Sequence, residues 1–126
     1  MKKCLLSLIM LVTIPGLCGC GSAGEVDTAL GKAKREGKTV MLELGSEGCI
    51  PCEQMKPVMK RLSTDYRGKL EVLFIDVGKD RETSRRFRVV VIPTQVFLDR
   101  NGKEFQRHVG FFSYEEIQAL LRQRGL

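Results

Sequence analysis

The sequence predicts an α/β fold in which a mixed sheet of four strands, or five, carries helices on both faces. Two apolar runs of strand length, 39–44 and 70–76, flank a helical segment, and strands joined by such a crossover lie parallel. A second pair of runs, 94–98 and 103–109, is joined by a turn built on Asn101-Gly102, which is typical of an antiparallel hairpin. Parallel and antiparallel pairs together make a mixed sheet, and helices on its faces bury its apolar side chains.

The helical segments follow from apolar residues at intervals of three and four. These intervals predict helices over 25–36 and 52–66, a short basic helix over 81–87 and a last helix through Ile117 and Leu121. Ser113 and Glu116 have the spacing of a capping box at the start of that last helix. Pro57 lies inside the second helix and should kink it. Met55 and Met59 share the apolar face of the second helix, so we expect core residues there rather than metal ligands.

The first residues are interpreted as a targeting segment. Two lysines precede an apolar stretch over 4–12, which is shorter than the about 20 residues that span a bilayer but fits a signal peptide. The run Leu17-Cys18-Gly19-Cys20 resembles a bacterial lipobox. This resemblance implies cleavage before Cys20 and lipidation of that cysteine.

The expected organisation is a lipoprotein-type signal peptide over 1–19, a lipidated tether over 20–24 and one domain over 25–126. An ordinary secretory signal that is cut at Gly19 or Ala23, or an uncleaved signal-anchor, is the alternative.

The chain carries a modest excess of positive charge. Its formal net charge of +6 falls to +4 in residues 20–126, because two lysines and no acidic residues lie in the expected signal peptide. Such an excess suits contact with anionic lipid headgroups but is too small for a nucleic-acid footprint, so no nucleic-acid partner is expected. An arginine cluster on the short helix is interpreted as a solvated helix face rather than a phosphate site: Arg81, Arg85, Arg86 and Arg88.

Cys49 and Cys52 give the strongest chemical signal, because they are the only cysteines of the expected domain and stand at the start of a helix that follows a strand. Unpaired backbone N–H groups and the helix dipole favour a thiolate at such a position. A thiolate at Cys49 can attack a disulfide, and Cys52, one turn further along, can then resolve the mixed disulfide. Pro51 restrains the loop between them. A metal site is the alternative, but the domain has no second cysteine pair and His108 is its only histidine, so no metal is expected.

These features together resemble the thioredoxin superfamily over residues 26–126. Cys49-Ile50-Pro51-Cys52 is similar to the family's redox motif, Pro57 to the proline of its active-site helix and Gly110 to the glycine after its hairpin. The resemblance implies a thioredoxin fold.

Ile92-Pro93-Thr94 is similar to the family's cis-proline loop. This implies a cis peptide bond before Pro93 and contact of Ile92, Pro93 and Thr94 with substrate. Gly48 and Phe74 stand where the family commonly has tryptophan and lysine. In this respect the sequence is more similar to exported thioredoxin-like relatives than to cytosolic thioredoxin.

Glu43 lies in an otherwise apolar strand, six residues before Cys49, where the family has a buried acid. The resemblance implies a catalytic role in which a buried carboxyl of raised pKa takes the proton from the Cys52 thiol. A strand-end acid that faces water is the alternative. His108, on the hairpin, is expected to be a surface residue.

The resemblance implies a thiol–disulfide oxidoreductase on the extracytoplasmic side of a bacterial membrane, with the Cys49–Cys52 disulfide in place of a separate cofactor. We expect a monomeric protein-disulfide reductase or electron carrier that acts on oxidised proteins or apocytochrome thiols. A membrane thiol-electron transporter would re-reduce it, and Ile92 before the proline is more similar to reducing members. The alternatives are a disulfide oxidase or isomerase, a non-enzymatic binding lipoprotein and a metal-delivery protein.

Overall fold

The computed structural model describes residues 23–126, and the expected signal peptide and the lipidation site at Cys20 lie outside this range. Its helices are α1 (Ala23–Arg35), α2 (Ile50–Asp65), α3 (Arg81–Arg86) and α4 (Tyr114–Gln123), and its strands are β1 (Thr39–Gly45), β2 (Leu70–Asp76), β3 (Thr94–Leu98) and β4 (Glu104–Val109). Within these residues, no helix is long and apolar enough to cross a membrane.

The four strands form one mixed sheet in the order β2-β1-β3-β4. β1 pairs parallel with β2, and β3 pairs antiparallel with both β1 and β4. The parallel unit and the hairpin predicted from the sequence are therefore confirmed, and the described part of the chain has no fifth strand. β1 is the inner strand shared by both kinds of pairing, and all seven of its residues are buried.

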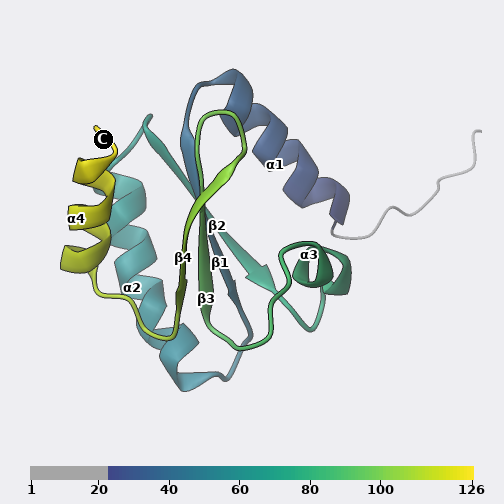
Figure 1. Ribbon diagram of the computed structural model, residues 1–126. Coiled ribbons are helices and arrows are strands. Elements are labelled where there is room, and N and C mark those ends of the chain that lie inside the picture. Colours follow the sequence, from purple (N-terminus) through teal and green to yellow (C-terminus); the bar gives the residue numbers. More distant parts are fainter. Residues whose placement is uncertain (1–22) are drawn as a thin grey trace, which may run out of the picture.

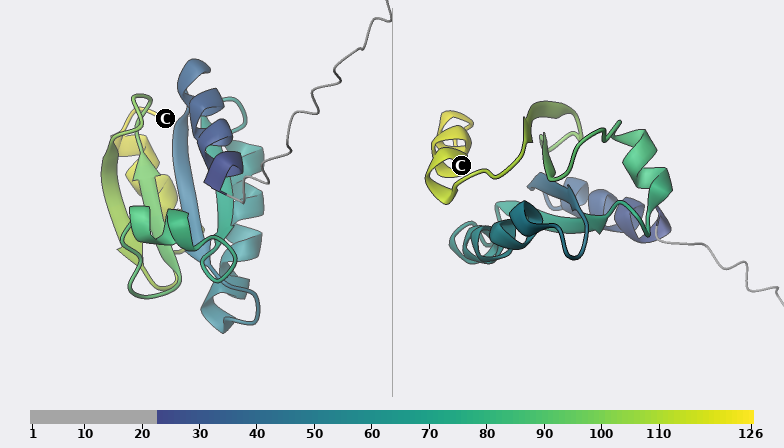
Figure 2. Two further views of the ribbon diagram at one scale, coloured as in Figure 1. Left: turned by 90° about the vertical axis from the view of Figure 1, so that its right-hand side faces the viewer. Right: turned by 90° about the horizontal axis from the view of Figure 1, so that it is seen from below.

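Helices cover both faces of this sheet, as predicted. α2 and α4 lie on one face, and α1 and α3 lie on the other (Figure 1; the views in Figure 2 show the same layers). Each face has its own apolar core. Met41, Phe97 and Met55 belong to the core under α2 and α4, whereas Leu42 and Val96 belong to the core under α1 and α3. Neighbouring residues of a strand alternate between the two cores because successive side chains point to opposite faces.

The helix ends follow the sequence signals closely. α2 begins at Ile50, two residues earlier than expected, because Pro51 is tolerated in the first turn, where its missing N–H has no intrahelical partner. The helix continues through Pro57, which has no N–H to donate to the carbonyl of Glu53. At the other end of the chain, Ser113 and Glu116 form the predicted capping box.

The arginine cluster is largely a solvated surface, as interpreted from the sequence. Arg81, Arg85 and Arg88 are exposed. Arg86 departs from that interpretation in part, because it pairs with Asp27 and so links α3 to α1.

Candidate active site

Cys49 and Cys52 lie at the start of α2, just after the end of β1. Cys49 is the N-cap residue of α2 and accepts the first intrahelical hydrogen bond, from the N–H of Glu53 to its carbonyl oxygen at 2.9 Å. Cys52 lies one turn further along, and the two cysteines form a disulfide with a Cα–Cα distance of 5.2 Å. Cys49 is half-buried, whereas only 1% of Cys52 is exposed. The first cysteine is therefore open to a partner and the second is enclosed.

Gly45, the last residue of β1, makes room for the enclosed cysteine. A Cβ atom at this position would lie 3.0 Å from the Sγ atom of Cys52, which is tighter than nine in ten real Cβ contacts. The absence of a side chain thus lets α2 approach the strand closely enough to bury Cys52. Sequence reasoning missed Gly45, although a glycine at the end of an apolar strand is a signal of close approach.

The loop before β3 lies against the same end of β1. Thr94 pairs with Leu44 in the antiparallel register, so Pro93 comes beside Gly45 and the cysteine pair. The Ile92–Pro93 peptide bond is cis, as the resemblance implied. The loop is held from both sides, because the Thr94 hydroxyl donates to the Val91 carbonyl at 2.6 Å and the Gly110 N–H donates to the Pro93 carbonyl at 2.8 Å. Pro93 and Thr94 are buried and Ile92 is half-buried.

Glu43 is fully buried and faces the cysteine side of the sheet. It lies two residues before Gly45, so both positions point to the face against which Cys52 packs. Burial raises the pKa of Glu43 to about 7, and the amide of Gln95 opposes this shift in part. The burial expected for the family's acid is therefore present, and the water-facing alternative is wrong.

A row of polar side chains extends from Glu43 across the sheet. Gln95 is the cross-strand partner of Glu43 on β3, and His108 is the partner of Gln95 on β4. Gln95 is fully buried and donates from Nε2 to the Gly110 carbonyl at 3.1 Å. Its Oε1 and both carboxylate oxygens of Glu43 are buried without a hydrogen-bond partner in the structure. A proton on Glu43 supplies the one donor that this group of acceptors lacks, so the neutral carboxyl suits its surroundings better than the carboxylate does.

Sequence reasoning missed Gln95, and its expectation of a surface position for His108 is met only in part. The histidine was expected on the surface, but it is half-buried and its ring stacks on Phe112 with a centroid distance of 4.0 Å. Its register with Gln95 explains the difference, because the residue opposite a buried side chain shares that side chain's face.

Exposed apolar side chains surround the cysteine pair. Ile50, between the two cysteines in sequence, is 75% exposed, and Val91, which precedes the cis-proline loop, is 54% exposed. Phe111 follows Gly110 and is also exposed. Large apolar groups gathered beside an accessible sulfur form a surface on which a polypeptide can be bound. Among residues 23–126, no group of three or more histidine, cysteine or acidic side chains is arranged to hold a metal ion.

Comparison with known proteins agrees with this geometry. The model of the thioredoxin-like domain matches residues 26–125. The chain belongs to the thioredoxin-like family.

Individual members of the family align over most of the domain. The thioredoxin of Staphylococcus aureus is 29% identical over 89 residues, which cover 71% of this chain and 85% of that protein. Among solved structures, a thioredoxin h of poplar superposes with a TM-score of 0.70 at 27% identity, covering 79% of this chain and 91% of its own. The germline-specific thioredoxin Deadhead of Drosophila melanogaster gives a TM-score of 0.65 at 27% identity, covering 80% and 89%. These likenesses support a thioredoxin-like redox function for the Cys49–Cys52 pair of this family member.

The raised pKa of Glu43 predicts a distinctive dependence of stability on pH. Well below pH 4.5 the carboxyl is protonated in the folded and unfolded chains alike, whereas above about pH 7 folding buries a charge. Stability should therefore fall as the pH rises through this window, and Glu43→Gln, which carries no charge, should escape the loss. We expect the oxidised variant to gain roughly 3 kcal/mol of unfolding free energy relative to the wild type between pH 4 and pH 8.

Denaturant unfolding of both proteins at a series of pH values measures this difference. Groups other than Glu43 are the same in the two proteins, so their contributions cancel in the difference between the two unfolding free energies. A wild-type-minus-variant difference that stays constant with pH would contradict the raised pKa.

Proposed function

We propose that this protein is a dithiol reductant or electron carrier of the bacterial cell envelope that acts on protein disulfides through Cys49 and Cys52. The observation that carries the proposal is the pairing of an accessible N-cap cysteine with an enclosed cysteine one turn later, beside the cis-proline loop. The family membership supports disulfide chemistry, and the exposed side chains of Ile50, Val91 and Phe111 support polypeptide substrates.

In the proposed reaction, the Cys49 thiolate attacks one sulfur of a substrate disulfide. A mixed disulfide forms and the other substrate sulfur leaves as a thiolate. Cys52 then loses its proton and attacks Cys49, which releases the second substrate thiolate and leaves the Cys49–Cys52 disulfide. Two electrons pass from the protein dithiol to the substrate, and a membrane thiol-electron transporter would return the protein to its reduced form. Oxidised proteins and apocytochrome thiols are the substrates that we propose.

The order of attack can be tested by trapping. Cys52→Ser should accumulate a mixed disulfide with substrate proteins, because nothing is left to resolve it, whereas Cys49→Ser should accumulate none. Non-reducing electrophoresis followed by mass spectrometry of the linked peptides measures both. Mixed disulfides formed through Cys52 would contradict the assignment of Cys49 as the nucleophile.

Glu43 is proposed as the group that receives the Cys52 proton. A carboxyl with a pKa of about 7 is divided between its two protonation states near neutral pH, so its carboxylate form can accept a proton. Glu43→Gln should therefore slow the second step while leaving the first attack by Cys49 almost unchanged. Rapid-quench measurement of mixed-disulfide formation and decay separates the two steps, and an equal slowing of both would contradict the role.

The direction of electron flow is decided by the reduction potential of the cysteine pair. We expect a potential near about −270 mV, at the reducing end of the known range, from equilibration with glutathione or dithiothreitol buffers. A potential near about −120 mV would instead identify a disulfide oxidase. A pair that does not exchange with either buffer would support a non-enzymatic binding protein.

The proposed attachment to the membrane depends on Cys20. Palmitate labelling of growing cells should mark the wild-type protein and not Cys20→Ala, which should also become soluble. Cys18→Ala is the matched control and should keep the label, because alanine is common at this position of a lipobox. An exported wild-type protein that carries no label would contradict the anchor.

A further inference from the structure

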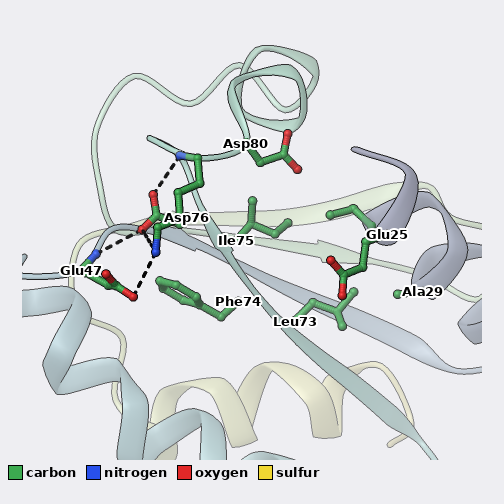
Figure 3. Close-up of a pocket in the computed structure, with 10 residues that line it drawn as sticks. Glu25, Ala29, Glu47, Leu73, Phe74, Ile75, Asp76 and Asp80 are labelled. Atoms are coloured by element: carbon green, nitrogen blue, oxygen red, sulfur yellow. Dashed lines mark hydrogen bonds and ion pairs between the residues drawn. The ribbon is translucent and has the colours of Figure 1, made fainter. Parts of the chain in front are cut away.

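A groove runs along the free edge of β2, outside the cysteine site. It has a volume of about 450 Å³ and lies between the start of α1 and the segment that leads into α3. Leu73 and Ile75 of β2 form its apolar floor, together with Val26 and Ala29 from α1. Figure 3 shows Phe74 and Glu47 at one end of this floor and Glu25 at the other. β2 is one of the two edge strands of the sheet, so no further strand of residues 23–126 covers this side.

The rim of the groove is acidic on a protein with net positive charge. Four of its residues are acidic, Glu25, Glu47, Asp76 and Asp80, and one is basic, Lys79. Lys79 already has partners, since its Nζ lies 3.2 Å from Glu47 and 4.0 Å from Asp76. Within residues 23–126, neither Glu25 nor Asp80 forms an ion pair. Two carboxylates of the rim thus have no cationic partner among the described residues.

Of these two acids, Asp80 is the stronger indication of a binding site, because it is buried. Only 4% of the residue is exposed, and its Oδ1 accepts a hydrogen bond from the N–H of Thr83 at 2.9 Å. Its Oδ2 is buried and has no hydrogen-bond partner within the part of the chain that the structure describes. The Asp80 carboxylate lies on the α3 side of the groove and the Glu25 carboxylate on the α1 side, with Ile75 between them (Figure 3). A buried acceptor without a partner costs folding free energy. Asp80 lines the groove, so a cation bound there would lie beside this side chain.

One end of the groove lies next to the cysteine site. The Phe74 ring lies 3.3 Å from the position that a Cβ atom of Gly45 would take, and the Sγ of Cys52 lies 3.0 Å from the same position. Glu47 belongs to the loop that carries Cys49, two residues ahead of it. The N–H of Glu47 reaches the Asp76 carboxylate at 3.5 Å, which ties this loop to the rim. A polypeptide linked to Cys49 therefore has the groove within reach of its neighbouring residues.

We propose that this groove binds an arginine side chain of the protein with which Cys49 exchanges its disulfide. The planar guanidinium has donors in several directions, so it can pair with Asp80 and Glu25 together while its aliphatic stem covers Leu73 and Ile75. The inference rests on the proposed function, because it takes the partner to be a disulfide substrate or an electron donor. It adds a rule of selection: partners with arginine near the reactive cysteine are preferred.

The test compares arginine with citrulline, which has nearly the same shape and no charge. Disulfide-linked peptides with a fluorophore and a quencher carry a single arginine, moved residue by residue away from the half-cystine, and each has a citrulline twin. The pre-reduced full-length protein should reduce the best-placed arginine peptide with a kcat/KM about tenfold above that of its twin, the order expected for a partly desolvated charge pair.

Substitutions locate the source of this preference. In Asp80→Asn and Glu25→Gln the ratio should fall towards one, and asparagine keeps the oxygen that caps α3, so the first variant should fold. Glu82→Gln is the matched control, because Glu82 is an exposed acid of α3 that does not line the groove, and its ratio should stay at the wild-type value. A wild-type ratio near one at every arginine position, or a ratio that Asp80→Asn and Glu25→Gln leave unchanged, would overturn the proposal. If neither peptide of any pair is reduced, the proposed function itself fails, and the docking inference falls with it.

Cross-linking identifies the occupant directly. A zero-length carbodiimide reagent, applied with a lysine version of the best peptide, should join Glu25 to the peptide lysine. A bond from Glu25 to a lysine of the same chain, or to a second copy of the protein, would show that another segment fills the groove and would overturn the proposal.

Discussion

The burial of β1 on both faces is the constraint on which the rest of the structure depends. Met41 and Leu42, neighbours on this strand, belong to opposite cores, so the strand fixes the positions of both helical layers. Its end is fixed as well, because the parallel pairing with β2 and the antiparallel pairing with β3 both reach its last residues. The cysteine loop, the cis-proline loop and the β2 groove all meet at that end. A rigid inner strand thus holds three separate segments in one place, as a redox site requires.

The burial of β1 also explains the raised pKa of Glu43. An ionised carboxylate inside a sheet is strongly disfavoured unless it is paired, and Phe74, the residue opposite Glu43 on β2, offers no charge. The protonation equilibrium of Glu43 therefore shifts towards the neutral acid. Gln95 is a neighbour that suits either form of the carboxyl, because an amide both donates and accepts hydrogen bonds. The pKa of this group is set mainly by its burial, and Gln95 opposes the shift in part.

Much of this arrangement could be predicted from the sequence because it depends on local signals. The strand bounds of β2 and β3, the capping box of α4 and the cysteine pair at a helix start all follow from residue patterns a few positions long. The burial of Glu43 could also be anticipated, since one acid in an apolar run has few places to point.

The features that escaped prediction depend on register and on distant segments. His108 is half-buried because it lies opposite the buried Gln95 on another strand, and Gly45 is required because a helix packs against it. Asp80 resembles an ordinary helix cap in the sequence. The groove beside its Oδ2 atom becomes visible only when α1, more than 40 residues earlier in the chain, is placed opposite it. No pattern along one segment carries that information.

The unequal exposure of the two cysteines has a consequence for how the protein behaves among other thiols. Of the two cysteine sulfur atoms in the described residues, that of Cys49 is within reach of solvent and that of Cys52 is enclosed where α2 packs on Gly45. With respect to intermolecular bonds the domain is therefore monovalent. It can hold one partner at a time through sulfur, and it cannot act as a link in a disulfide-bonded chain of molecules. In an oxidising compartment crowded with exposed cysteines, such a domain joins a partner and lets it go without building a polymer.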